Sequence, residues 1–399
     1  MRRAAVLLVL AAVVALPRAA EPRIDVPPGV EVERFARGIP HPSNLAFDRR
    51  GRLWVTSAGH LTARADGVWM VPRRGARPRH VVRRLFSALG LLWHRGELYV
   101  SHVTPYATVS ASGHEGRVVA FSGFDGRRFE RSRVVVDGLP TGRHRVDSLA
   151  AGPDGRIYLG VGSEFDARRS RHRRSGTIVS FRPSGADLRI EARGLRNPYG
   201  LAFIPGSARL LVSEHGRDDL GDDRPPEELN LVRTRGPARW YGFPECWGQG
   251  GRPCRGSVRP LERLRAHSAP GAVVVAPRFG RYGRSAFVAR YGSSFSGNRS
   301  GGDVVRVSLP RRGRARVRRF ATGFGLQDPL GLALGRGGAL YVSRWSRGSV
   351  VRLVPPRRQV GAFGAVAPER TFAFVPWPRD ELRALRAAGR TAPAARVSP

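Results

Sequence analysis

The chain has 399 residues, 41% of them apolar and 25% charged, which is enough for a hydrophobic core in one large domain or two to three ordinary ones. All 69 basic residues are arginine, against 31 acidic residues, and the formal net charge is +38. A nucleic-acid partner would explain such a charge, but arginine spread over every loop without any lysine favours a bias toward GC-rich codons. We therefore expect no nucleic-acid partner.

The N-terminus has the layout of a secretory signal. Two arginines precede an apolar run from residue 4 to 16, and the small pair Ala19-Ala20 follows. The run is too short to span a bilayer, and no other segment approaches a membrane span. We expect residues 1–20 to be a signal peptide and the mature protein to be periplasmic or secreted, with no membrane span.

One pattern then recurs: an apolar strand, a Gly/Asp turn, a strand rich in β-branched and aromatic residues, and a third strand. Most copies are followed by an arginine-rich outer strand, such as RARVRRFATG. Each hairpin has its turn chemistry in place. The six copies begin at Asn44, Leu89, Ser148, Gly200, Ala272 and Gly331.

Six such units, about 45–70 residues apart, predict an all-β fold: a six-bladed β-propeller of four-stranded antiparallel blades. The early segment GVEVERFARG has the outer-strand character that is missing after the last copy. We expect it to pair with the final blade and close the ring, which leaves no exposed edge. A β-sandwich is the competing fold, but it does not explain the same strand order six times.

The propeller is expected over residues 21–357. The tail, 358–399, contains the amphipathic segment RDELRALRAAGR and is expected to hold a short helix. Cys246 and Cys254 are close in sequence, so in an oxidising compartment we expect a local disulfide that closes a glycine-rich loop. The further ligands of a zinc site and the C-x-x-C-H motif of a haem attachment are not visible.

In a propeller the first strand of each blade lines the central channel, so the residues just before these strands converge on one pocket. Turn chemistry explains Asn44 and Asp328 among them. It does not explain His144, Arg196 and His267, and we therefore expect a shared ligand pocket at the axis. Five of the six pre-strand segments are polar: HPSN, GRHRVDS, RNPYG, HSAPG and LQDPLG.

These stretches resemble the soluble quinoprotein glucose/sorbosone dehydrogenases, six-bladed propellers that carry pyrroloquinoline quinone (PQQ) and calcium. The resemblance extends from about Val32 to Val354, and it is closest to the sorbosone dehydrogenase branch. It implies a dehydrogenase that oxidises an aldose or sugar aldehyde and passes electrons to an external acceptor, since no haem motif is present. Its most specific pieces are GLRNPYGLAF, SEHG with EELNLV and WYGFPECWG, and HSAPGAVVV with AFVARYGSSFSGNRSGGDVVRV.

The resemblance also implies roles for single residues. His144 matches the catalytic histidine, the general base that takes a proton from the substrate hydroxyl as a hydride passes to the quinone; an unperturbed imidazole pKa of ~6.5 suits this role. Arg196 and Asn197 match residues that hold the quinone oxygens. The backbone carbonyls of Gly216 and Arg217 match a loop that binds calcium, a cation that prefers oxygen ligands.

Further positions follow from the same resemblance. His267 is expected to contact the cofactor, and Arg344 or Arg299 would replace the lysine that glucose-oxidising members place on it. Relatives often orient the histidine with the Asp of a Gly-Asp pair; this chain has Gly162-Ser163, which leaves Glu164 or Asp147 as substitutes. The acidic run DDLGDDRPPEE is either a second calcium site or a solvated loop.

Two other functions remain open. One is an exported, non-catalytic propeller that binds a ligand in the same pocket. The other is a propeller hydrolase or lactonase with a channel metal, which would need several carboxylates in the pre-strand segments; only Asp147 and Asp328 qualify. The fold alone does not decide among them.

Overall fold

The computed structural model describes residues 23–59, 65–104, 115–248, 254–292, 296–310 and 314–356. These residues form 25 β-strands, and they contain no helix long and apolar enough to cross a membrane. The expected signal peptide and the expected helical tail both lie outside the described residues.

The strands form six sheets, which follow one another along the chain as blades 1 to 6. Blade 1 contains β2 (Pro42–Phe47), β3 (Leu53–Ser57), β4 (Gly67–Val71) and β5 (Arg79–Arg83). Blade 2 contains β6 (Phe86–His94), β7 (Glu97–Thr104), β8 (Glu115–Phe124) and β9 (Phe129–Pro140). Blade 3 contains β10 (Val146–Ala151), β11 (Ile157–Val161), β12 (Thr177–Phe181), β13 (Arg189–Arg193) and a short added strand, β17 (Arg239–Trp240).

Blade 4 contains β14 (Pro198–Phe203), β15 (Arg209–Glu214), β16 (Glu227–Arg233) and β18 (Glu262–Leu264). Blade 5 contains β19 (Pro270–Ala276), β20 (Ser285–Arg290), β21 (Asp303–Ser308) and β22 (Arg316–Ala321). Blade 6 contains β23 (Leu332–Leu334), β24 (Leu340–Arg344), β25 (Ser349–Val354) and, as its outer strand, β1 (Glu31–Arg37).

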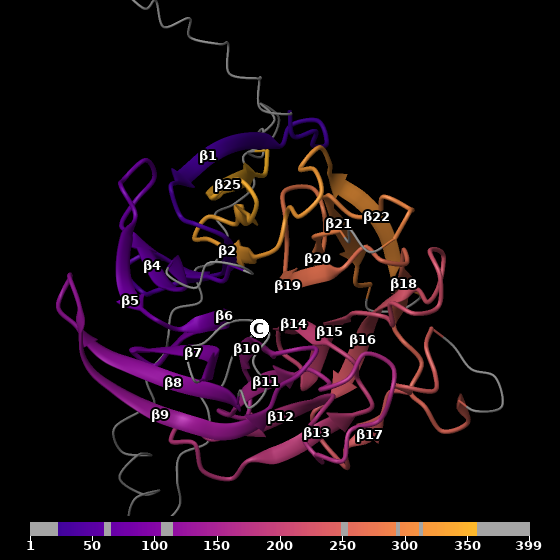
Figure 1. Ribbon diagram of the computed structural model, residues 1–399. Helices are drawn as coiled ribbons and strands as arrows, with labels where there is room; N and C mark the ends of the chain where they lie inside the picture. The colour runs from indigo at the N-terminus through magenta and orange to yellow at the C-terminus, as the bar shows by residue number, and fades with distance from the viewer. Residues whose placement is uncertain are drawn as a thin grey trace, which may run out of the picture. The chain divides into compact units, whose positions relative to one another are not determined.

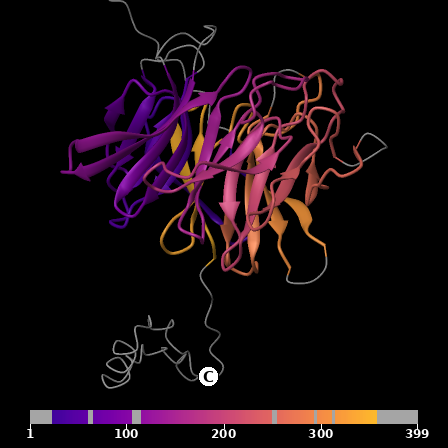
Figure 2. The same ribbon diagram turned by 90° about the horizontal axis from the view of Figure 1, so that it is seen from below.

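The predicted six-bladed propeller is therefore confirmed, with β17 as an unpredicted fifth strand that pairs in parallel with β13. The predicted closure is also confirmed, because β1 pairs antiparallel with β25 from Glu31 opposite Val354 to Arg37 opposite Ser349. Figure 1 shows β2, β6, β10, β14 and β19 nearest the centre of the ring, and Figure 2 shows the same ring from its edge.

Hydrophobic packing between neighbouring blades holds the ring together. Six clusters of buried side chains each mix residues of two successive blades; Tyr99 of blade 2, for example, packs with Leu159 of blade 3. Full burial of one such side chain contributes about 1.5–3 kcal/mol. A seventh cluster of buried residues, Tyr199, Leu330 and Trp345, joins blade 4 to the segment before β23 and to the loop between β24 and β25 of blade 6.

A serine hydroxyl also links neighbouring blades near the axis by hydrogen bonds. The Gly90 N–H donates to Ser101 Oγ on the next strand, and that hydroxyl donates to the Asp147 carbonyl of the following blade at 2.6 Å. A Cβ atom on Gly90 would lie 2.2 Å from this carbonyl oxygen, so only glycine permits the approach. The same arrangement occurs in blade 4, where the Gly200 N–H donates to Ser213 Oγ and that hydroxyl donates to the Gly271 carbonyl of blade 5.

Most innermost strands are irregular where they begin. The pairing of β10 with β11 shifts between Val146 and Leu149, and that of β14 with β15 shifts between Pro198 and Leu201. Such bulges change the direction in which side chains point. They therefore lie at the places where the polar pre-strand segments reach the axis.

Candidate active site

A cavity of about 540 Å³ lies where the innermost strands begin. The predicted site residues that line it are His144, Arg196, Asn197, Gly216 and His267. Segments far apart in sequence thus meet at one place, as the radial arrangement of the blades predicts. The other lining residues include Arg143, Arg145, Asp147, Tyr199, His215, Asp218, Glu227, Tyr291, Gln327, Leu330 and Trp345.

Arg344 and Arg217, both predicted to be site residues, are not among the lining residues of this cavity. Arg344 is buried at the end of β24. The Arg217 guanidinium instead pairs with Asp219 at 2.6 Å and donates to the Pro244 carbonyl at 2.9 Å. The predicted calcium contact at Arg217 involves its backbone, which these side-chain contacts leave untested.

His144 is buried in the cavity wall and is held in one tautomer. Its Nδ1 lies 2.9 Å from the Ser163 carbonyl oxygen, which can only accept, so Nδ1 must carry the proton. Nε2 is then an unprotonated acceptor. A main-chain carbonyl thus orients the imidazole, rather than the Glu164 or Asp147 carboxylate expected from the sequence.

Burial and the Arg196 guanidinium hold the pKa of His144 well below its usual value. The sequence-based expectation of an unperturbed value therefore needs correction. The direction of the shift keeps the imidazole neutral at pH 7, and a neutral imidazole is the form that accepts a proton.

Arg196 is 3% exposed and lies in a network of ion pairs. Its Nη2 donates to Asp218 Oδ2 at 2.7 Å and to Asp166 Oδ1, and its Nε donates to the Asp166 carbonyl at 3.0 Å. Asp218 also accepts from Arg143 at 3.2 Å. Burial raises the pKa of Asp218, but Arg196 and Arg143 outweigh that effect and lower it.

Asn197 and His215 form a second fixed pair. His215 Nε2 lies 3.0 Å from the Pro270 carbonyl and must donate to it, so Nδ1 accepts from the Asn197 amide at 3.1 Å. Burial and Arg196 lower the pKa of His215 to about 4, which keeps it neutral. The amide donor of Asn197 is used in this pair, and its Oδ1 is left without a partner among the described residues.

Buried carboxylates hold the turn at Gly216. Glu227 accepts from the Gly216 N–H at 2.6 Å and from the Ala269 N–H at 3.1 Å. Burial outweighs these two bonds and raises the pKa of Glu227 to about 8. Glu214 accepts in turn from the backbone N–H groups of Arg196 and Asn197.

The acidic run from residue 218 to 228 does not gather around one point. Asp218 and Asp219 pair with arginines, and Asp223 accepts from the Asn298 amide. Among the described residues, no group of three or more His, Cys, Asp or Glu is placed to hold a metal ion. A calcium ion here would depend on main-chain oxygens, as the resemblance implies.

Sequence reasoning missed the aromatic lining. Tyr199 stacks on His215 with ring centroids 5.7 Å apart, and Tyr291 meets Trp345 edge-on at 5.7 Å. Tyr199 follows the Arg-Asn-Pro motif directly, which is the one signal that marked it. Tyr291 and Trp345 each follow the second strand of a blade, and nothing in their local sequence distinguishes them from core residues.

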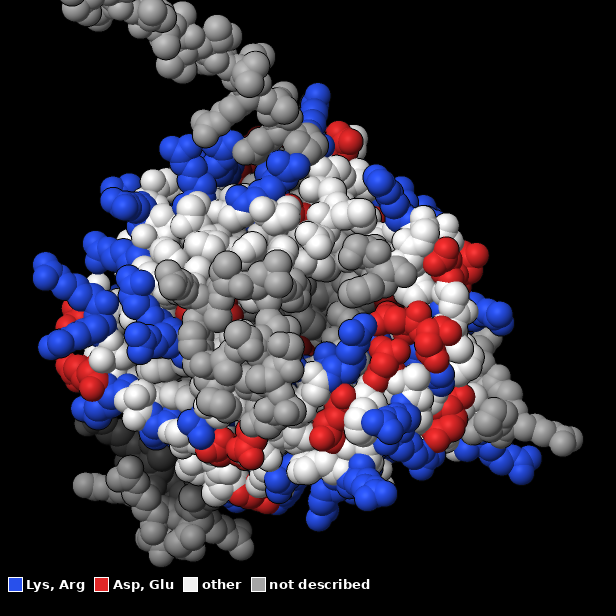
Figure 3. Space-filling model, in the orientation of Figure 1, with Lys and Arg blue, Asp and Glu red and all other residues white. Residues whose placement is uncertain are grey.

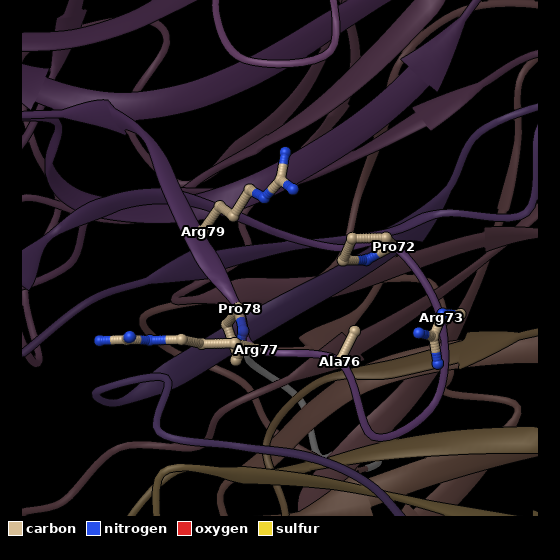
Figure 4. Close-up of a pocket in the computed structure, with 6 residues that line it drawn as sticks. All are labelled: Pro72, Arg73, Ala76, Arg77, Pro78 and Arg79. Carbon is tan, nitrogen blue, oxygen red and sulfur yellow. The ribbon is translucent and has the colours of Figure 1, made fainter.

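A second hollow lies at the outer edge of blade 1, between β4 and β5 (Figure 4). Three exposed arginines, Arg73, Arg77 and Arg79, line it, and their guanidinium groups point in different directions. Figure 3 shows basic side chains at many places along the edge of the viewed face, with acidic side chains among them. This hollow lacks the convergent, buried polar groups of the central cavity.

Comparison with known proteins decides the family. Residues 39–251, more than half of the chain, match the family described as Glucose / Sorbosone dehydrogenase. The chain belongs to this glucose/sorbosone dehydrogenase family.

The predicted disulfide is present as well, since Cys246 and Cys254 are bonded.

Two curated proteins are similar in sequence to this chain over part of their length. The aldose sugar dehydrogenase YliI of Escherichia coli is 24% identical over 56% of this chain and 64% of that protein. An uncharacterized protein of Borreliella burgdorferi is 23% identical over 57% of this chain and 58% of that protein. The alignments thus span less than two thirds of either relative.

Solved structures match over more of the chain. A putative oxidoreductase (glucose dehydrogenase) of Thermus thermophilus is 26% identical, with 82% of this chain and 100% of that chain covered at a TM-score of 0.63. The PQQ domain of pyranose dehydrogenase from Coprinopsis cinerea is 17% identical, with 85% and 99% covered at a TM-score of 0.65. The second likeness concerns the fold alone.

Proposed function

We propose that the protein is a quinoprotein dehydrogenase that oxidises an aldose or a sorbosone-like sugar aldehyde, with His144 as general base. One observation carries the proposal. The Ser163 carbonyl accepts a hydrogen bond from the Nδ1–H of His144 in the cavity wall, which leaves the unprotonated Nε2 of the neutral imidazole to accept a proton from a substrate hydroxyl. Family membership supports the reaction class.

The residues present fit PQQ, which is flat and polyanionic. Arg143, Arg145 and Arg196 line the cavity together with the rings of Tyr199 and Trp345. Guanidinium groups suit carboxylates and aromatic rings suit a flat ring system. When bound, the quinone would supply the hydride acceptor that no side chain can provide.

Several residues would hold the cofactor and its calcium in this proposal. Arg196, Asn197 and His267 would contact the quinone, and Gly216 and Arg217 would offer carbonyl oxygens to the cation. Arg344 lies beyond the lining, so we assign the anion-binding role of the missing lysine to Arg143 and Arg145. His267 is held for this purpose by the Gly221 carbonyl, which accepts from its Nε2 at 2.9 Å.

The chain's own residues prepare the proton transfer. Burial and Arg196 disfavour the imidazolium before substrate arrives, so Nε2 stays free to accept. The aspartates paired with Arg196 balance its charge, and this pairing holds the guanidinium in one place. A fixed base of this kind contributes about 10²–10⁴ in rate.

The test uses the purified protein mixed with PQQ and calcium, a dye as external acceptor and a panel of aldoses and sugar aldehydes. Dye reduction that falls at least a hundredfold in His144→Ala, but not in the exposed-histidine control His172→Ala, supports the proposal. Failure of the wild-type protein to bind PQQ would instead favour the non-catalytic ligand-binding propeller.

We also propose export of the protein to the periplasm or medium after removal of residues 1–20. The disulfide between Cys246 and Cys254 supports this, because such bonds persist in oxidising compartments. Mass spectrometry of the secreted chain would identify the new N-terminus and the bonded cysteines. A cytosolic, full-length, reduced chain would refute the proposal.

A further inference from the structure

The cavity wall contains an unusual concentration of buried polar atoms that lack a partner. Asp147 Oδ2 and the hydroxyls of Tyr199 and Tyr291 have no hydrogen-bond partner among the described residues. Asp147 is 1% exposed and Tyr199 6% exposed. Because buried polar groups are nearly always hydrogen-bonded, three such groups around one cavity indicate a ligand that completes them.

The backbone around Asp147 is held tightly. Asp147 lies in the bulge that begins β10, and its carbonyl accepts from Ser101 Oγ at 2.6 Å. The same carbonyl lies against Gly90, where no side chain would fit. The carboxyl group therefore extends from a fixed point, as a binding group must.

The two tyrosines are fixed by their neighbours. The Tyr199 ring is nearly parallel to that of His215, with 6° between the planes, and Tyr291 meets Trp345 at 80°. Their hydroxyls have little freedom to find partners elsewhere in the protein. Tyr199 also packs in the apolar cluster at the axis with Leu330 and Trp345.

The three groups lie close enough to influence one another, and burial favours the uncharged form of each. Burial and the charges of Asp147 and Tyr291 raise the pKa of Tyr199. Burial, and then Glu214, raise the pKa of Asp147 well above its usual value against the opposing effect of Arg145. The raised pKa favours the protonated form of the Asp147 carboxyl, which with two phenols offers O–H donors and acceptors.

This chemistry selects a class of ligand. An anion would bind at Arg143 and Arg196 rather than at these three groups, and a metal ion would need ionised oxygen ligands. Aromatic faces with neutral O–H groups between them suit the C–H faces and hydroxyls of a sugar ring. The three groups come from blades 3, 4 and 5, so a ring at the axis can reach all of them.

We propose that Asp147, Tyr199 and Tyr291 form a hydroxyl-binding subsite for a sugar ring. The proposal rests on the proposed function, since it assigns the substrate hydroxyls that do not react, while His144 meets the one that does. Asp147, Tyr199 and Tyr291 would then determine which sugar is accepted.

The test measures binding without chemistry. The full chain without PQQ is titrated with 1,5-anhydro-D-glucitol, a sugar analogue that lacks the anomeric hydroxyl, and binding is followed by calorimetry and tryptophan fluorescence. Tyr199→Phe and Tyr291→Phe are each expected to weaken binding about five- to thirtyfold, the usual range for a lost buried hydrogen bond. Tyr282→Phe, outside the cavity, should leave the dissociation constant within twofold.

Asp147 is tested by a pair of variants. Asp147→Leu removes the hydrogen-bonding group and should weaken binding at least tenfold, whereas Asp147→Asn keeps such a group and should bind within threefold of wild type. The two phenylalanine variants keep the ring packing, so they report on the subsite even if Asp147→Leu fails to fold.

The outcomes separate the two proposals. Binding of the analogue that is weakened in both phenylalanine variants supports the subsite, even where the PQQ-loaded protein oxidises nothing and the proposed function fails. No binding by the wild type, or binding within twofold in both phenylalanine variants, overturns the subsite. Sugar oxidation that depends on His144 would still support the proposed function in that case.

Discussion

Two groups of side chains share the central cavity and differ in how completely they are partnered. The ion-pair group, Arg143, Arg196, Asp166 and Asp218, is joined by direct contacts between opposite charges. The subsite residues, Asp147, Tyr199 and Tyr291, each have an oxygen without a hydrogen-bond partner among the described residues. Folding completes the first group, and a ligand is needed to complete the second.

The difference has a general lesson. A buried charge without a counter-ion costs several kcal/mol, so a chain must pair its arginines and aspartates internally. A buried neutral hydroxyl costs about 1–3 kcal/mol when unpaired, which a protein can tolerate at a binding site. Variants of the ion-pair residues should therefore affect folding most, and variants of the subsite residues Asp147, Tyr199 and Tyr291 should affect binding most.

The largest expected effect follows from Arg196→Ala. Removal of this buried guanidinium leaves Asp166 and Asp218 with only the more exposed Arg143 as counter-ion, and it should lower the free energy of unfolding by about 3 kcal/mol. Urea denaturation followed by fluorescence measures the change. The control Arg189→Ala breaks an exposed ion pair with Asp187 and should leave the midpoint unchanged. Equal midpoints for the two variants would contradict the distinction between the groups.

Asp218→Asn should have a smaller effect on stability, about 1.5–3 kcal/mol, because a hydrogen bond to a charged group is lost. The pKa of Asp218 is lowered in the folded protein, so its contribution is present above the unfolded pKa and is lost as pH falls. The variant and wild type should therefore converge in acid. The freed arginines should also bind a polyanion such as citrate more tightly, which calorimetry can measure.

Asp147→Asn should change stability in the opposite direction. Because the pKa of Asp147 is raised in the folded protein, wild type loses stability as pH rises above the unfolded value of ~3.9. The variant lacks this penalty, so it should be more stable at pH 8 by roughly 1 kcal/mol and equal near pH 4. Thermal unfolding at the two pH values is the measurement. A variant less stable at pH 8 would show that Asp147 is ionised and partnered.

The smallest expected effect is on the pH profile of activity. The pKa of His144 is lowered, so the base should stay neutral below the usual histidine value of ~6.5. We expect kcat/KM of the PQQ-loaded protein to fall less than twofold between pH 7.5 and pH 6.5. An acid limb centred at pH 6.5 or above would indicate an exposed, unperturbed imidazole in place of the buried one.

Local sequence patterns were enough to predict most of the fold. The hairpin pattern repeats six times and each copy needs only its own turn and alternating side chains, so blade number, strand order and closure by β1 all follow. The Cys246–Cys254 bond is equally local. The parallel strand β17 was missed because two residues, Arg239 and Trp240, form no recognisable pattern.

The sequence by itself therefore determined the ring and the convergence of His144, Arg196, Asn197 and His267 on its axis, because periodic hairpins dictate which segments precede the innermost strands. The family resemblance placed Gly216 with them. Only the tertiary structure decided their partners. The Ser163 carbonyl orients His144, and Asp166 reaches Arg196 from thirty residues away. The first contact lies within blade 3 and the second joins blades 3 and 4. Both depend on how bulges and loops direct the chain at the axis, and no local pattern of residues encodes that direction.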